Sequence, residues 1–146
     1  MTKGKIQSIH AAVMAFFILA SGCSVPNLAT PECSAARDVV KRFYSFHFAN
    51  EVQPSAEALK ERSGYLTERL SDELKQVGDR EKDYFTQTAD FPKAFRVGAC
   101  TGGDDGRAAV QVVLLWRDDS RSEQTEVQVS AVKNGETWSI DSVVKN

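Results

Sequence analysis

The stretch that decides the fold is residues 107–117, Arg-Ala-Ala-Val-Gln-Val-Val-Leu-Leu-Trp-Arg. Its apolar side chains recur at every second position, which is the period of a β-strand. One face carries five apolar residues: Ala108, Val110, Val112, Leu114 and Trp116. The other face is apolar in its middle, at Val113 and Leu115, so we expect a central strand that is covered on both faces.

Three more strands are predicted around this one. Their core-facing residues are Phe95, Val97 and Ala99, then Val127, Val129 and Ala131, then Trp138 and Ile140 of a strand over 137–144. Turn-forming residues separate the strands, at 101–106, at 118–120 and at Asn134-Gly135. The sequence therefore predicts a four-stranded antiparallel meander.

Helical spacing replaces this alternation on the N-terminal side. Thr30, Pro31 and Glu32 indicate a helix start, and a stripe of residues follows at helical spacing: Ala36, Val40, Phe43, Tyr44 and His47. A second helix is expected from Ser55 to Glu61 and a third along the stripe Leu66, Leu70, Leu74 and Val77, before an irregular connection over 79–92. The predicted fold class is α+β, with three N-terminal helices packed on a curved, cone-like sheet in one domain, residues 31–146.

Composition excludes several classes of protein. The chain has 146 residues and a net charge of −2, so it lacks the basic character of a nucleic-acid module. Two histidines and three cysteines are too few for a zinc ribbon or a cluster. Asp104, Asp105, Asp118 and Asp119 lack the spacing of a calcium loop and fit turns instead. We predict no cofactor and no metal.

The first residues read as a targeting segment. Lys3 and Lys5 precede an apolar run over 11–20, which as a helix spans only about 15 Å and is too short for a permanent membrane anchor. We expect residues 1–22 to be a signal peptide. Its removal would leave the mature chain two charges more negative.

Residues 19–23, Leu-Ala-Ser-Gly-Cys, resemble the lipobox of bacterial lipoproteins. The resemblance implies cleavage before Cys23, acylation of Cys23 with palmitate-type chains, and a lipidated tether over 23–30. Ser24 after the cysteine implies the outer membrane, with the domain facing the periplasm. The competing interpretation is ordinary signal cleavage, which leaves Cys23 as a plain thiol.

Cys33 and Cys100 then remain in a compartment that oxidises thiols. We expect them to form a structural disulfide, for which loop entropy predicts about 4 kcal/mol of stabilisation. Two buried free cysteines are the alternative.

Four short tracts stand out in the domain: residues 39–44 (VVKRFY), 65–70 (YLTERL), 83–92 (DYFTQTADFP) and 138–141 (WSID). These tracts resemble uncharacterised bacterial envelope proteins of the domain-of-unknown-function 3828 type. The order of helices and strands also resembles the wider nuclear-transport-factor-2-like, or cystatin-like α+β, superfamily. The resemblance implies a fold and a compartment, but it supplies no reaction.

One group of residues could form a small-molecule pocket. His47 is a candidate general base, and Asp83 with Asp90 could form an acid–base pair beside Tyr44 and Tyr84. In the alternative interpretation His47 is a core-edge histidine with one hydrogen bond, Asp90 fixes the turn before Pro92, and Asp83 is solvated.

The second face of the central strand, at Val113 and Leu115, is a candidate protein-binding or dimer face. Side chains or a loop of the same chain could cover it instead.

Two functions from different classes follow. We predict a non-enzymatic outer-membrane lipoprotein that binds an envelope partner or a second copy of itself, with the membrane contacted through its lipid anchor. The alternative is a small-molecule enzyme, an isomerase or a hydrolase, that uses an acid–base residue in the cone.

Overall fold

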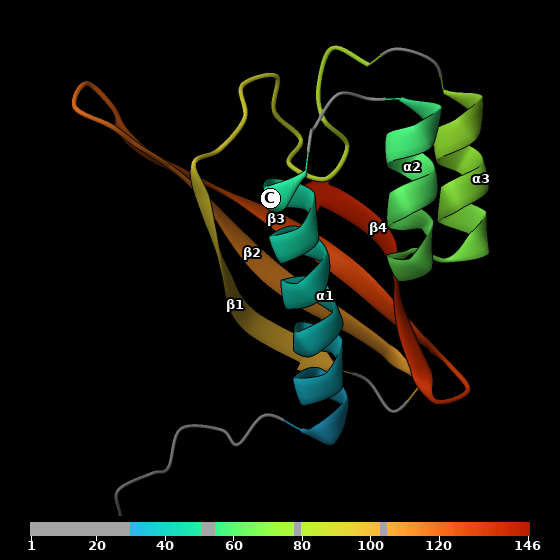
Figure 1. Cartoon of the computed structure of the whole chain (residues 1–146). Coiled ribbons are helices and arrows are strands. Elements are labelled where there is room, and N and C mark those ends of the chain that lie inside the picture. The colour runs from blue at the N-terminus through green and yellow to red at the C-terminus, as the bar shows by residue number, and fades with distance from the viewer. Residues whose placement is uncertain (1–29, 51–54, 78–79, 103–104) are drawn as a thin grey trace, which may run out of the picture.

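The computed structural model describes residues 30–50, 55–77, 80–102 and 105–146. In chain order their elements are α1 (Pro31–Ala49), α2 (Ala56–Arg62), a 3₁₀ helix η1 (Ser63–Tyr65), α3 (Glu68–Gln76), β1 (Ala94–Gly102), β2 (Arg107–Arg117), β3 (Ser122–Asn134) and β4 (Thr137–Lys145). Helices come first and strands last, so the predicted α+β class is confirmed (Figure 1).

The sheet is the predicted antiparallel meander, in the order β1-β2-β3-β4. Val112 of β2 lies opposite Val97 of β1 and Val127 of β3, so these valines share one face of the sheet. Gly135, at a φ of 61°, takes the left-handed conformation that the tight β3–β4 turn requires.

A bulge in β1 corrects one detail of the predicted pattern. The pairing register shifts between Val97 and Cys100, so Cys100 packs against the core and Ala99 is exposed. Gly98 sits within the bulge, where an added Cβ would come within 2.5 Å of the Gln111 side chain. The strict alternation of Phe95, Val97 and Ala99 is therefore wrong at its last residue.

Helix α1 lies across the sheet and covers the face on which the core forms (Figure 1). The side-chain oxygen of Thr30 accepts a hydrogen bond from the Cys33 amide at 3.2 Å, and Pro31 occupies the first turn, as predicted. Its inward face is buried along its length and packs on the inner residues of the strands: Ala36, Val39, Val40, Phe43 and Tyr44 against Val110, Val112, Leu114, Val127, Val129 and Ile140.

Helices α2 and α3 do not share that position. They stand together beside the β4 edge, where η1 and α3 contact β4 (Figure 1). The Thr67 amide donates to the Ile140 carbonyl at 2.8 Å, which fixes the start of α3 to that edge. The expectation that all three helices pack on one face of the sheet is corrected, because the 19 residues of α1 already occupy that face.

The predicted disulfide is present between Cys33 and Cys100, with a Cα–Cα separation of 5.7 Å. It joins the first turn of α1 to β1, across 67 positions of sequence. The β1 bulge makes this bond possible, because it brings Cys100 to the face on which α1 lies.

On the opposite face, Val113 is only 2% exposed and Leu115 is half-buried. Val113 lies between its cross-strand neighbours Arg96 and Glu126, and Gln111 donates to the Glu126 carboxylate at 2.8 Å on the same face. Long polar side chains therefore flank the valine. An interaction at Val113 and Leu115 stays a prediction.

The predicted signal peptide and the Cys23 tether lie outside the described residues. Among the residues that the structure describes, no helix combines the length and the apolar character needed to cross a bilayer.

Candidate functional site

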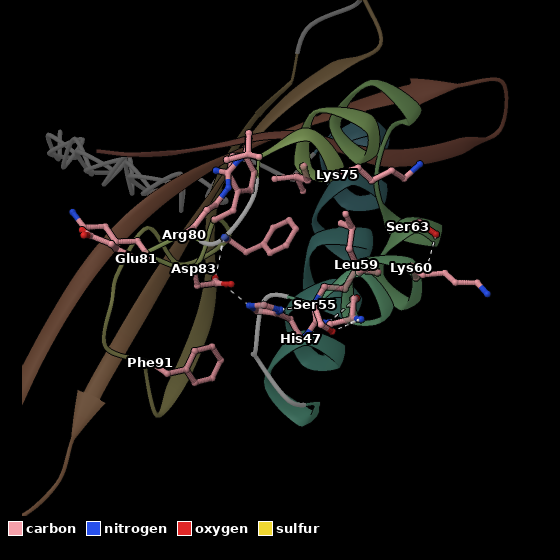
Figure 2. Close-up of a pocket in the computed structure, with 18 of the residues that line it drawn as sticks. His47, Ser55, Leu59, Lys60, Ser63, Lys75, Arg80, Glu81, Asp83 and Phe91 are labelled. Carbon is pink, nitrogen blue, oxygen red and sulfur yellow. Dashed lines mark hydrogen bonds and ion pairs between the residues drawn. The ribbon is translucent and has the colours of Figure 1, made fainter.

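A cleft of about 880 Å³ opens between the α2–α3 pair and the connection that leads to β1. One wall comes from α2 and α3, the other from residues 80–91, and the end of α1 closes the base through His47. Figure 2 shows His47 and Asp83 pointing toward each other across this space, with Leu59 and Phe91 on opposite sides.

His47 occupies the base of the cleft because of its place on α1. It lies four residues after Phe43 and three after Tyr44, so all three side chains share the buried helix face. The imidazole stacks on the Phe43 ring at 5.5 Å, packs edge-on against Phe85 and Phe91, and is only 1% exposed.

Both ring nitrogens of His47 are hydrogen-bonded. The Arg62 Nε donates to Nδ1 at 2.8 Å, and Nε2 lies 3.2 Å from Asp83 Oδ1. A guanidinium has no acceptor, so Nδ1 must be unprotonated and Nε2 must carry the hydrogen that Asp83 accepts. The ring is therefore neutral, and it links a buried cation to a carboxylate. We call these three residues the Arg62–His47–Asp83 bridge.

Asp83 also orders the wall to which it belongs. Its Oδ1 accepts from the backbone amides of Phe85 at 3.0 Å and Thr86 at 2.8 Å, besides His47. Burial favours the neutral acid, but the bonds from His47 and Thr86 outweigh that effect and lower the pKa of Asp83 below 3.8. Asp83 is not the solvated carboxylate that one interpretation expected.

Arg62 is the member of the bridge that the sequence reasoning missed. It stands in the mixed-charge run 60–62, which indicates a solvated helix surface, yet its residue is only 3% exposed. Its guanidinium donates to the Ala58 carbonyl at 2.8 Å, and burial lowers the pKa of Arg62 below its usual value. The available signal was its spacing of three from Leu59, which places both on the inward face of α2.

The two tyrosines of the predicted pocket have structural partners. The Tyr44 hydroxyl is fully buried and donates to the Phe85 carbonyl at 2.6 Å, and burial, followed by the nearby Asp83, raises the pKa of Tyr44 well above 10. Tyr84 lines the cleft, and its hydroxyl accepts from the Val143 amide at 3.4 Å.

Asp90 engages a different partner from Asp83. Its carboxylate pairs with Arg121, whose guanidinium also contacts Glu123 and lies over the Trp116 ring at 5.0 Å. The predicted acid–base pair of Asp83 and Asp90 therefore does not form. Of the predicted pocket residues, the structure brings His47, Asp83 and Tyr84 to the cleft and packs Tyr44 behind them.

The surface that the cleft offers to a ligand is largely apolar. Its accessible apolar residues come from both walls: Leu59, Leu74, Val77, Tyr84 and Phe91. Val77 is 46% exposed at the end of α3, which is unusual for a large apolar side chain here. Lys60 and Lys75 point away from the opposite wall (Figure 2). Within the described ranges, no three carboxylate, imidazole or thiol groups gather to hold a metal ion.

Comparisons with known proteins show the fold and nothing finer. No family model matches the chain, and no curated protein sequence matches it. Solved structures with a similar fold include a chain of the type VI native effector–immunity complex Tae3–Tai3 from Ralstonia pickettii, with a TM-score of 0.56 and 19% identity over 81% of this chain and 96% of that one. Another is a protein of unknown function from Bacteroides thetaiotaomicron, with a TM-score of 0.48 and 15% identity over 80% of this chain and 90% of that one. The resemblance to the two predicted families stays a prediction.

Proposed function

We propose that this chain is a non-enzymatic binding module of the bacterial cell envelope, anchored in the outer membrane through lipidated Cys23 and facing the periplasm. Its cleft between α2–α3 and residues 80–91 takes an apolar segment of a partner protein.

The observation that carries this proposal is that the acid–base groups of the cleft are already hydrogen-bonded within the protein, while much of its accessible surface is apolar. The groups able to move protons, His47 and Asp83, are hydrogen-bonded to each other, to Arg62 and to backbone amides. Most of the accessible lining is apolar, with Val77 at the lip, and charged side chains such as Arg80, Glu81 and Lys82 stand on one wall. Apolar side chains around an open cleft are the usual anchor points for a protein segment.

The fold supports a protein as the occupant. A chain of an effector–immunity complex, in which one protein binds another, has the same fold as this chain over most of its length. That likeness concerns the fold alone, so the identity of the partner does not carry over.

An enzyme is favoured less by the same geometry. A general base needs a free lone pair within reach of the substrate, and the only lone pair on the His47 ring accepts from Arg62. Freeing it would break a contact of an arginine that is itself buried.

The cleft is tested with two matched positions. Val77 and Val144 are both large, apolar and about half exposed, at 46% and 52%, but only Val77 borders the cleft. A photo-crosslinking residue at Val77 should give one protein adduct in living cells, whereas the same residue at Val144 should not. With the partner identified and purified, Val77→Arg should weaken its binding about tenfold or more, and Val144→Arg should not.

Two outcomes would overturn the cleft proposal. One is equal crosslinking from both positions. The other is a co-purifying small molecule, seen by native mass spectrometry and lost in Val77→Arg, which would favour the enzyme or a small-ligand carrier.

The anchor is tested separately. Cys23→Ala should abolish labelling with a palmitate analogue and release the domain from outer-membrane fractions. The reason is that stable membrane anchoring needs two or more acyl chains, and the variant lacks the cysteine that would carry them. If the substituted protein still fractionates with that membrane, the lipid anchor is wrong and the cleft proposal is unaffected.

A further inference from the structure

The two outer edges of the sheet differ in how their backbone is covered. At the β4 edge, the preceding segments bond to the strand at four points: Thr67 N to Ile140 O, Arg69 to Asp141 O, Gln87 Nε2 to Val143 O, and Val143 N to the Tyr84 hydroxyl. Residues 67–69 and 84–87 therefore protect this edge from pairing with another strand.

The β1 edge has no such cover within the described residues. β1 is the first strand of the sheet order, bonded to β2 on one side, and none of the described segments pairs with its other side. A strand directs alternate backbone groups to either side, so part of the backbone of this nine-residue strand points outward. Such an edge is a template for an added strand.

A groove of about 510 Å³ runs along this edge, between β1 and α1. Phe95 and Val97, both half-buried, form its apolar part. Its charged residues are Arg37, Asp38 and Lys41 of α1 and Arg96 of β1. Among the described residues no ion pair engages Arg37, Lys41 or Arg96. Arg37 and Lys41 lie on the α1 side of this groove beside Asp38, whereas Arg96 is the cross-strand neighbour of Val113 and belongs to the other face of the sheet. An acidic chain thus has two cations and one carboxylate on the α1 side of an open strand edge.

The geometry points to an extended, acidic segment of a partner protein as the occupant, and we propose that it adds to β1 as a fifth strand. Its backbone would pair with the outward groups of β1, and the carboxylates on its α1-facing side would meet Arg37 and Lys41. A second copy of this chain fits poorly, because joining two β1 edges would bring two cationic grooves together. The groove shares no lining residue with the cleft, so the two proposals stand or fall separately.

The probe is a fluorescent peptide of alternating Glu and Val, as long as β1, added to the full-length chain. It should bind with an affinity that falls as salt rises. Arg37→Glu/Lys41→Glu should weaken it about tenfold or more. The matched control Arg117→Glu/Lys145→Glu makes the same change of charge at exposed strand ends elsewhere and should bind as the unchanged protein does.

A second measurement separates strand pairing from simple charge attraction. The same peptide with alternate backbone nitrogens methylated keeps its carboxylates but loses the donors of a β-ladder, and it should not bind. A benzophenone residue at the exposed Ala99 of β1 should crosslink the unmodified peptide, and one at the exposed Glu136 should not.

Three results would overturn the proposal. They are equal binding of the methylated peptide, equal binding by Arg37→Glu/Lys41→Glu, and no binding by the full-length chain. A dimer in sedimentation that Arg37→Glu/Lys41→Glu abolishes would show that a second copy occupies the edge instead.

Discussion

The two ends of α1 are fastened to the rest of the molecule by different chemistry. At its start, Cys33 is covalently bonded to Cys100 of β1. Near its end, His47 joins Arg62 of α2 to Asp83 of the connection through hydrogen bonds. The first link ties the helix to one strand, and the second ties it to two segments that do not belong to the sheet.

Because the two links differ chemically, they should respond to different changes in the surroundings, namely reduction and pH. A disulfide is indifferent to pH but is lost on reduction. The Arg62–His47–Asp83 bridge is indifferent to reductants but depends on pH, because Asp83 accepts its hydrogen bonds as an ionised carboxylate. The start of α1 is therefore redox-sensitive, and its end is pH-sensitive.

The largest effect is expected from removing the covalent link. Cys33→Ala/Cys100→Ala should lower the free energy of unfolding by about 4 kcal/mol, since the bond closes a long loop in the unfolded chain. Urea unfolding at neutral pH measures this. Cys23→Ala serves as the control and should leave the free energy unchanged; a loss below about 1 kcal/mol in the double variant would contradict the expectation.

The hydrogen-bonded link should contribute nearly as much to the free energy of unfolding. His47→Leu should cost about 3 kcal/mol in urea unfolding, because it leaves the buried Arg62 and Asp83 without their shared partner. His47→Leu/Arg62→Leu should recover part of that loss, since the buried cation is then removed as well. The destabilisation caused by Arg62→Leu alone is the reference. If the double variant is less stable than His47→Leu by that full amount, the bridge does not act as a unit.

A smaller effect is expected from acid. The pKa of Asp83 is lowered in the folded state, so its stabilisation is complete above the ordinary value of 3.8 and is lost as pH falls through the lower folded value. Stability should therefore fall with acid in this window more steeply in the unchanged protein than in Asp83→Asn. Thermal unfolding against pH measures the slope, and equal slopes in the unchanged protein and Asp83→Asn would contradict this expectation.

The smallest effect belongs to the other aspartate. The side chains of the Asp90–Arg121 pair are 61% and 34% exposed, so solvent screens their attraction. Asp90→Ala should change the free energy of unfolding by less than about 1 kcal/mol. A larger loss would show that the contact of Arg121 with the Trp116 ring depends on Asp90.

Sequence periodicity was sufficient for the elements that pack in one direction. β2 shows this best, because its alternation of Val110, Val112 and Leu114 follows directly from a strand with one face on a core. The helix cap at Thr30 was likewise readable, since capping depends on residues adjacent in sequence.

Features that depend on a partner distant in sequence could not be predicted from periodicity or from neighbouring residues. The bulge at Gly98 breaks an alternation that looks regular, although a lone glycine inside a strand is a signal for one. Arg62 resembles its charged neighbours, and only the folded chain places it against His47. The sequence therefore predicted two members of the bridge as candidates, but not the third member that determines their protonation.

The meander has a consequence for the order in which the chain can fold. Every strand pairs with its neighbour in sequence, so the sheet forms through local contacts, which close quickly. Helix α1 is made first, yet its apolar face packs on strands that are made last. Until residue 145 has been synthesised, Val40, Phe43 and Tyr44 lack much of their final surroundings. A growing chain therefore carries an exposed apolar helix for most of its synthesis, and that helix is the segment most in need of a chaperone.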